Sequence, residues 1–289
     1  MKKTMILIFL LLAFALGERA AAQELIGSAG AGYFWSVKTP DPTIGNYEFV
    51  EAKLMFGHKI RYGPLANYTW VYAKQSKETP YYYKGRFYTL GLSFDTWGSV
   101  LHRNYYAWAN PGIRWDYDRG ATLGYHSWQK DKLFILQTGL RLTNLGSDWL
   151  GNSLFMAEWQ KPLAKGKNRF STDPEIIKEG IPYEKGAFRL VYENGVKKFS
   201  FSIKERQIRF EPILHLGYGW EKTYDRKYYE YGGGFAFSYF KEWQRELFKI
   251  KVYRRQDFGG YNPQNLDGSQ APSWHVEIVA NLLRLKLKK

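Results

Sequence analysis

Residues Val50–Tyr62 read VEAKLMFGHKIRY, and within this stretch the character of the side chain changes at every second position. Six of the seven even positions are Val, Ala, Leu, Phe, Ile or Tyr, whereas the odd positions are Glu, Lys, Met, Gly, Lys and Arg. Such alternation is typical of a β-strand whose two faces meet different surroundings. The thirteen residues exceed the usual strand length of about five or six, and about 9–11 suffice to cross a bilayer. The stretch therefore predicts a long amphipathic strand.

The same alternation recurs along the rest of the chain. In several segments one face is bulky and apolar while the other is small or polar, which suits a narrow barrel that must hold some long charged side chains inside. Gly232–Gly234 lacks the Lys-Ser/Thr of a phosphate-binding loop, so we interpret it as a place where strands pack closely or bend. The alternating segments are Ala66–Tyr72, Tyr88–Phe94, Phe134–Leu142, Leu214–Trp220, Tyr229–Tyr239 and Trp274–Leu282.

The start of the chain has the layout of a secretory signal peptide. Two lysines precede a 12-residue apolar run, Met5–Leu16, and the small residues Ala20-Ala21-Ala22 follow. The run is shorter than the roughly 20 residues of a spanning helix, which favours a cleaved signal over a membrane anchor. We therefore expect residues 1–22 to be a signal peptide and residues 23–289 to form one outer-membrane β-barrel domain.

Composition supports the same class. Aromatic residues make up 18% of the chain, yet its mean hydropathy is −0.47. A transmembrane barrel reconciles the two values, because its outer band is apolar, its interior is polar, and Trp and Tyr gather at the membrane interfaces. The formal charge of +15 favours an anionic membrane surface or anionic solutes, and no Lys/Arg run resembles a nucleic-acid-binding arm. The absence of Cys excludes disulfides, zinc–thiolate sites and thiol catalysis.

Turn and loop lengths give an expected topology, because outer-membrane barrels combine short turns at one end with long loops at the other. Leu101–Ser127 fits either one crossing or three, and Val196–Trp220 changes phase, which indicates a bulge or a small extra hairpin. The expected fold is all-β: an antiparallel up-and-down transmembrane β-barrel of about 12 strands, with about 10–14 admissible. Long loops are expected at Lys38–Asn46, Gln75–Gly85, Pro162–Gly186 and Arg255–Ser273, and short turns at Tyr62–Leu65, Thr143–Asp148, Lys241–Glu246 and Glu193-Asn194-Gly195, where Asn-Gly is a hairpin signal.

On these patterns the chain resembles the outer-membrane β-barrel proteins of Gram-negative bacteria. The resemblance covers Gln23–Lys289 and rests on alternation and loop lengths, not on a specific motif. Members of that class commonly end on an aromatic residue, whereas this chain ends Leu285-Lys-Leu-Lys-Lys289. The resemblance implies an outer-membrane location, contact with outer-membrane lipid and lipopolysaccharide, and insertion by the outer-membrane assembly machinery.

A soluble β-sandwich, or a lipocalin-like barrel that binds an apolar ligand, also has alternating strands, but its apolar face points inward. The length of the segments, the aromatics at their ends and the Gly-rich opposite faces favour the membrane version. We therefore expect Leu54, Phe56, Tyr68, Trp70, Leu90 and Leu92 to face lipid, and Lys53, Met55, Thr69 and Gly91 to face the lumen.

A lipid-modifying enzyme, either a phospholipase or a lipopolysaccharide-acting hydrolase, is the alternative to a non-enzymatic barrel. The resemblance suggests a test, because some small outer-membrane barrels hydrolyse lipids with a His and a Ser two apart on one strand. The close pair here is His126-Ser127, and adjacent strand residues point to opposite faces, so both are weak catalytic candidates. The five histidines show no metal-ligand spacing, and we expect no metal and no cofactor.

The charges expected inside the barrel point to a non-enzymatic function. Arg114, Asp116 and Asp118 share one strand face, which favours an Arg-compensated network over paired-carboxylate chemistry. His275 and Glu277 also share a face, and we expect them to form a hydrogen bond. We predict either a narrow channel for small, preferably anionic solutes or a surface protein that presents external loops, with a lumen that is closed if its charges pair. The expected lumen charges are Glu51, Lys53, Lys59, Arg61, Arg114, Asp116, Lys249, Lys251, His275 and Glu277.

Overall fold

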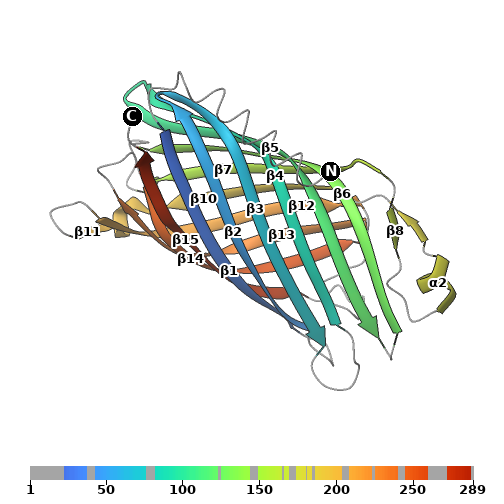
Figure 1. Ribbon diagram of the computed structural model, residues 1–289. Coiled ribbons are helices and arrows are strands. Elements are labelled where there is room, and N and C mark those ends of the chain that lie inside the picture. Colours follow the sequence, from blue (N-terminus) through green and yellow to red (C-terminus); the bar gives the residue numbers. More distant parts are fainter. Residues whose placement is uncertain are drawn as a thin grey trace.

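The protein is a closed, antiparallel β-barrel (Figure 1). In the computed structural model every strand of the wall pairs with its neighbours in chain order, and β1 pairs with β15 to close the cylinder. The described part of the chain comprises residues 23–37, 43–75, 82–122, 125–143, 149–164, 166–168, 174–179, 181–183, 186–203, 208–222, 225–239, 245–259 and 272–287.

Twelve of the described strands form the wall, which confirms the expected all-β fold and strand number. Most span 14–20 residues, but β7 and β10 span 10 and 9, still close to the length that crosses a bilayer. The wall strands are β1 Gln23–Ser36, β2 Thr43–Gly57, β3 Ile60–Gln75, β4 Tyr82–Val100, β5 Arg103–Thr122, β6 Tyr125–Thr143, β7 Ser153–Pro162, β10 Ala187–Gly195, β12 Ile208–Glu221, β13 Arg226–Tyr239, β14 Arg245–Gly259 and β15 Ser273–Leu287.

Short helices and strands lie at the two ends of the cylinder. At one end the 3-10 helix η1 (Lys197–Phe199) leads into β11 (Phe201–Ile203), which pairs with the start of β12 and is the small extra hairpin expected from the phase change. At the other end β8 (Gly166–Asn168) and β9 (Ile181–Tyr183) pair beside α2 (Pro174–Glu179), outside the barrel next to β6 (Figure 1). No described helix has the length and apolar character needed to cross a membrane.

The two ends of the barrel differ in their connections. Gln23 pairs with Leu287, so β1 starts and β15 finishes at the same end, which we call the terminal end. The terminal end also has the two-residue turns His58-Lys59 and Leu101-His102. The opposite end, which we call the loop end, carries the connection from β7 to β10 with its helix and hairpin. The longest connection lies at the loop end as expected, but β5 and β6 are joined there by only two residues, and β6 and β7 are joined at the terminal end by nine.

Two expected turns are wrong in position. Tyr62–Leu65 lies inside β3, because the chain already reverses at His58-Lys59, where Gly57 has φ +107°. Asn194 lies inside β10, paired with Ser153 on β7 and with Leu214 on β12. Its amide accepts a hydrogen bond from the Ser153 hydroxyl at 2.9 Å, so the Asn side chain is satisfied within the ladder without a turn.

The uncertain segment at Leu101–Ser127 contains one complete crossing. β5 runs from Arg103 to Thr122 as a single 20-residue strand, and β6 begins at Tyr125. Leu101 and His102 both have positive φ, at 50° and 61°, as the two central residues of a type I′ hairpin turn require.

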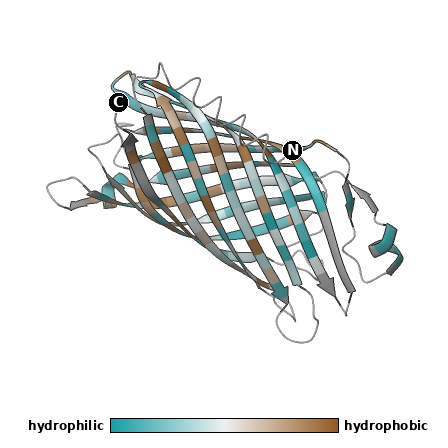
Figure 2. Ribbon diagram, viewed as in Figure 1, coloured by the Kyte–Doolittle hydropathy of each residue, from teal (hydrophilic) through white to brown (hydrophobic). Residues whose placement is uncertain are grey.

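Alternation places apolar side chains outside and polar ones inside, and Figure 2 shows the resulting change of hydropathy along each strand. Tyr68 and Leu92 are 37% and 43% exposed on the outer face, whereas Met55 is 1% exposed on the inner face. Phe56 shares the parity of the outer face but is 3% exposed and buried. A Cβ on Gly234 would lie 2.0 Å from the Ile250 carbonyl oxygen, which supports the interpretation of the glycine run as close strand packing.

Candidate functional site

A carboxylate on β10, Glu193, organises one side of the lumen. Its Oε2 accepts a hydrogen bond from Lys249 Nζ at 2.9 Å, and its Oε1 accepts one from Lys251 Nζ at 2.9 Å. His215 Nδ1 lies 3.2 Å from the same Oε1. Because β12 and β13 separate β10 from β14 in the wall, these contacts reach across the lumen.

A second carboxylate, Glu230 on β13, lies on the other side of the same histidine. Its Oε2 accepts from Arg189 Nη2 at 2.7 Å, and its Oε1 accepts from Arg255 Nη2 at 2.6 Å. His215 Nε2 lies 3.4 Å from Oε2 of this glutamate. One imidazole therefore lies between two glutamates, each of which also contacts two basic side chains.

Glu277 on β15 extends this arrangement to the far side of β1. Its Oε1 lies 2.8 Å from Lys251 Nζ, and its Oε2 accepts a hydrogen bond from the Tyr47 hydroxyl at 2.7 Å. Lys251 thus bridges two glutamates on different strands.

Aromatic rings line the same part of the lumen. The His275 ring stacks on Tyr253 with centroids 4.9 Å apart and on Phe34 with centroids 5.6 Å apart. Tyr253 in turn lies 4.6 Å from the His215 ring. His275 Nε2 is 2.9 Å from the Ser273 hydroxyl. The stack fills space between β1 and β12 with rigid side chains.

Together these groups form a connected set that we call the lumen network. It contains three carboxylates, four basic side chains, one tyrosine and His215, so positive charge is in slight excess. His215 is 0% exposed, Glu230 1% and Lys251 4%. Charges on the wall of a water-filled pore would be hydrated, whereas these charges are shielded by one another. The network consists of Tyr47, Arg189, Glu193, His215, Glu230, Lys249, Lys251, Arg255 and Glu277.

A separate ion cluster lies near the terminal end on the opposite wall. The Arg61 guanidinium on β3 makes two parallel hydrogen bonds to Asp95 on β4, at 2.7 and 2.6 Å, and a further contact to Glu24 on β1. Tyr106 donates to Asp95 at 3.0 Å, and the guanidinium lies 4.6 Å from the centroid of the Trp97 ring. This cluster joins the first strand to β3, β4 and β5 inside the barrel.

The arginine-compensated network expected on β5 is present. Arg114 donates two hydrogen bonds to Asp116, at 2.7 and 3.1 Å, and one to Gln160 on β7 at 3.0 Å. Asp118 accepts a hydrogen bond from the Tyr83 hydroxyl at 2.8 Å. Asp116 and Asp118 each accept hydrogen bonds, and the contacts of Asp118 with Tyr83 and of Arg114 with Gln160 link β5 to β4 and β7.

The remaining expected lumen charges do not all lie inside the barrel. Lys53 Nζ lies 2.9 Å from Glu51 on the inner face of β2. Lys59 is exposed in the turn after Gly57, where strand alternation has stopped, so its expected lumen position is wrong. The expected bond between His275 and Glu277 is also absent among the described contacts, because the histidine bonds to Ser273 while the glutamate binds Lys251 and Tyr47.

The weak catalytic candidates His126 and Ser127 are consecutive residues of β6. Their backbones pair with Ala121 and Gly120 on β5, without a bulge between them. Their side chains lie outside the described residues.

Four members of the lumen network were not among the expected charges: Arg189, Glu193, Glu230 and Arg255. Glu193 was assigned to a turn, and Arg255 to the edge of a loop. Parity offered a signal for the latter, since Lys249, Lys251 and Arg255 all lie on the same face of one 15-residue strand.

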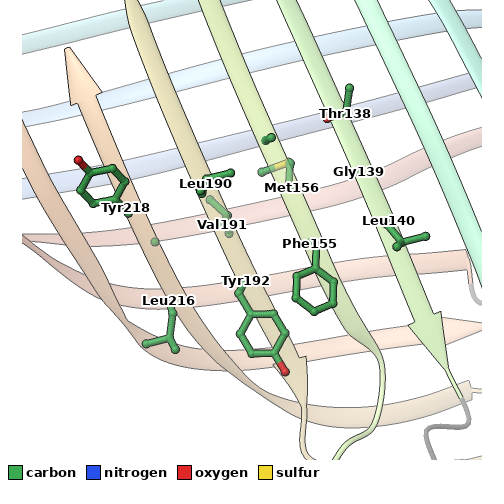
Figure 3. A pocket seen from close by; sticks show the side chains of 12 residues that line it. Thr138, Gly139, Leu140, Phe155, Met156, Leu190, Val191, Tyr192, Leu216 and Tyr218 are labelled. Atoms are coloured by element: carbon green, nitrogen blue, oxygen red, sulfur yellow. The ribbon is translucent and has the colours of Figure 1, made fainter. Parts of the chain in front are cut away.

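The outer wall carries a groove of 630 Å³ across β6, β7, β10 and β12 (Figure 3). Thr138 and Ala157 are paired small residues, and the next outward pair along the strands is Leu140 and Phe155. The lining is mainly apolar, with few side-chain polar atoms for chemistry. It comprises Thr138, Gly139, Leu140, Phe155, Met156, Ala157, Leu190, Val191, Tyr192, Leu216, Gly217 and Tyr218.

Within the described ranges, no group of three or more His, Asp or Glu side chains is placed to hold a metal ion.

The barrel has the architecture of Gram-negative outer-membrane β-barrels. It is similar to the translocator domain of the autotransporter NalP from Neisseria meningitidis, with a TM-score of 0.52 and 7% identity over 96% of this chain and 95% of that one. It is also similar to the transport unit of the autotransporter AIDA-I from Escherichia coli, with a TM-score of 0.51 and 8% identity over 93% and 92%. At such identities the similarity is one of fold. No protein-family model and no curated protein sequence matches the chain.

Proposed function

We propose that this protein is a non-enzymatic barrel of the Gram-negative outer membrane whose lumen is closed by the lumen network and whose function lies at its loop end. In this proposal residues 1–22 are a cleaved signal peptide and the outer-membrane assembly machinery inserts the barrel. The terminal end faces the periplasm, and the loop end presents its connecting segments to the exterior.

The burial of the lumen charges is the observation that carries this proposal. Lys251 contacts both Glu193 and Glu277, and Arg255 contacts Glu230, so these cations already have anionic partners. An anion would have to displace these carboxylates from short, charge-assisted hydrogen bonds, which are about twice as strong as neutral ones. The small inner residues Thr89 and Ser93 on β4 are buried as well, at 4% and 2% exposure. Side chains are thus buried along two different parts of the lumen wall, which supports a closed lumen.

Planar-bilayer recording with the refolded protein tests the closed lumen. We expect no discrete conductance steps in moderate salt, because in the proposed closed barrel the paired charges of the network block the path of hydrated ions. The slight excess of basic side chains favours one second candidate, a narrow anion channel. Reproducible anion-selective steps would establish that channel and refute the closed barrel.

Location is tested separately by cell fractionation with heat-modifiable gel mobility. We expect recovery with outer membranes, and faster migration of the unheated protein than of the heated one. Recovery in a soluble fraction would contradict the proposal and support a soluble ligand-binding barrel.

A further inference from the structure

The outer face of β4, β5, β6 and β7 is free of acidic side chains among the described residues. Among the described residues of these strands, the outward positions hold seven exposed basic side chains and no Asp or Glu; Arg103 lies at the terminal end, and the other six lie at the loop end. The carboxylates of these strands lie on the lumen face, as the contacts of Asp95, Asp116 and Glu158 illustrate. The six basic residues at the loop end, which we call the basic patch, are Lys84, Arg86, Arg119, Lys130, Lys132 and Lys161.

The basic patch lies beyond a belt of aromatic rings at the loop end. Lys132 Nζ lies 5.9 Å from the centroid of Trp115, and Lys130 Nζ lies 5.8 Å from that of Tyr117. The outward residues run from apolar through aromatic to basic on each strand, which is the order met when passing from the hydrocarbon to the headgroups of a bilayer. They are Leu90, Tyr88, Arg86 and Lys84 on β4, Ile113, Trp115, Tyr117 and Arg119 on β5, Leu136, Phe134, Lys132 and Lys130 on β6, and Ala157, Trp159 and Lys161 on β7.

Several of these cations are direct neighbours. Lys84 and Arg119 are cross-strand partners, and Lys130 and Lys132 lie on one face about 7 Å apart along β6. Like charges placed opposite each other destabilise a sheet, and a multivalent anion between them would reverse that effect. Glu48 on β2 is an exposed carboxylate in the same cross-strand row as Arg86, two strands away. The patch nevertheless remains strongly basic.

The groove in the outer wall begins just below this patch. On β7 the outward positions run from Lys161 through Trp159 to Ala157, which lines the groove. Lys161 lies four positions after Ala157, a span of about 13 Å along the strand. A fatty acyl chain attached to a headgroup at the patch can therefore pass over Phe134 and Trp159 and reach the groove.

We propose that the basic patch and the groove together bind one phosphorylated glycolipid of the lipopolysaccharide class. Its phosphate groups contact Lys132, Lys161 and their basic neighbours, and one acyl chain lies in the groove beside Ala157. This inference rests on the proposed function, because it requires the loop end to lie in the outer leaflet. A free phosphate would use only the patch, which separates the two sources experimentally.

The test is equilibrium binding of diphosphorylated lipid A to the mature barrel folded in detergent. Changing Lys132→Gln together with Lys161→Gln is expected to weaken binding on the order of tenfold at low salt. The matched control changes Lys222→Gln and Lys227→Gln, two exposed lysines near the same end on the β12–β13 side, and is expected to leave affinity unchanged. Filling the groove with Ala157→Trp is expected to weaken lipid A binding while leaving binding of inorganic phosphate unaffected.

Three results would overturn the inference. These are equal loss of affinity in the control, equal affinity for dephosphorylated lipid A, or full competition by millimolar inorganic phosphate with no effect of Ala157→Trp. The last would identify a phosphate site without a lipid. Gel mobility checks that each variant is folded, and if the double variant does not fold, wild-type affinity for phosphorylated against dephosphorylated lipid A decides the question. Fractionation reports on the proposed function independently of all these measurements.

Discussion

Replacing Glu193 by Gln removes the charge that joins the two halves of the lumen network. In the native barrel this carboxylate accepts hydrogen bonds from Lys249 and Lys251, both at 2.9 Å, and contacts His215 at 3.2 Å. Glutamine keeps the shape of the side chain but leaves one neutral acceptor oxygen for these three donors. Lys251 keeps its contact with Glu277 at 2.8 Å, so the loss is concentrated on the other two groups.

The expected cost follows from burial. Glu193 is 4% exposed and its two lysine partners are 8% and 4% exposed, so water cannot replace the lost ion pairs. Removing one partner of a buried ion pair typically costs about 3–5 kcal/mol. With a urea dependence of about 1–3 kcal/mol per M, a loss of 3 kcal/mol lowers the unfolding midpoint by at least about 1 M.

The assay is reversible urea unfolding of the barrel in lipid vesicles, followed by tryptophan fluorescence. Glu158→Gln is the matched control, because this lumen glutamate on β7 contacts the amides of Gln137 and Gln160. We expect a clearly smaller shift for the control. Equal midpoints for Glu193→Gln and wild type would refute the argument that the network stabilises the closed lumen. Bilayer recordings of the same variant are expected to show conductance steps that wild type lacks.

Three further predictions concern the wall. Leu92→Arg places a charge in hydrocarbon and should reduce the free energy of unfolding in vesicles by about 2–4 kcal/mol. Thr96→Arg lies on the same face closer to the terminal end and should reduce it by about 0–1 kcal/mol. Equal losses for the two variants would contradict the assigned depth. Replacing Leu101-His102 by Asn-Gly should raise the free energy of unfolding by about 1 kcal/mol, and the urea midpoint with it, since both positions have positive φ. A lower midpoint would argue against the type I′ turn. Gly234→Ala should destabilise by about 1–3 kcal/mol, because its Cβ would lie 2.0 Å from a carbonyl oxygen; an unchanged midpoint in the same assay would contradict that close approach.

The sequence could predict the barrel because its determinants are local. Alternation over Val50–Tyr62 reports on both faces of a strand without reference to any partner. The positions of the turns could be predicted less well. Asn194-Gly195 is a typical hairpin sequence, yet Asn194 lies inside the short strand β10. There the backbone bonds of Asn194 to both neighbouring strands outweigh the local turn preference.

The partners within the lumen could not be predicted from local pattern. Glu193 and Lys249 are 56 residues apart and meet only because the barrel closes with a particular register between β10, β12, β13 and β14. A shift of two residues on one strand would keep every side chain on its face and still change each ion pair. Parity therefore identified Lys249 and Glu277 as inner residues, but closure and register decide which group each of them meets.

Charged side chains lie inside the barrel and apolar side chains outside, which argues against the soluble alternative. A lipocalin-like barrel needs an apolar interior, yet here buried interior groups include Glu230, Lys251 and Arg255. Its exterior would have to be polar, whereas Leu92, Phe155 and Leu216 are each more than 40% exposed on the outer wall. Soluble monomers rarely expose contiguous apolar patches larger than a few hundred Å². Turning the wall inside out would place both the ion pairs and the apolar side chains in the wrong surroundings, so this distribution of side chains favours an apolar medium outside the barrel over water.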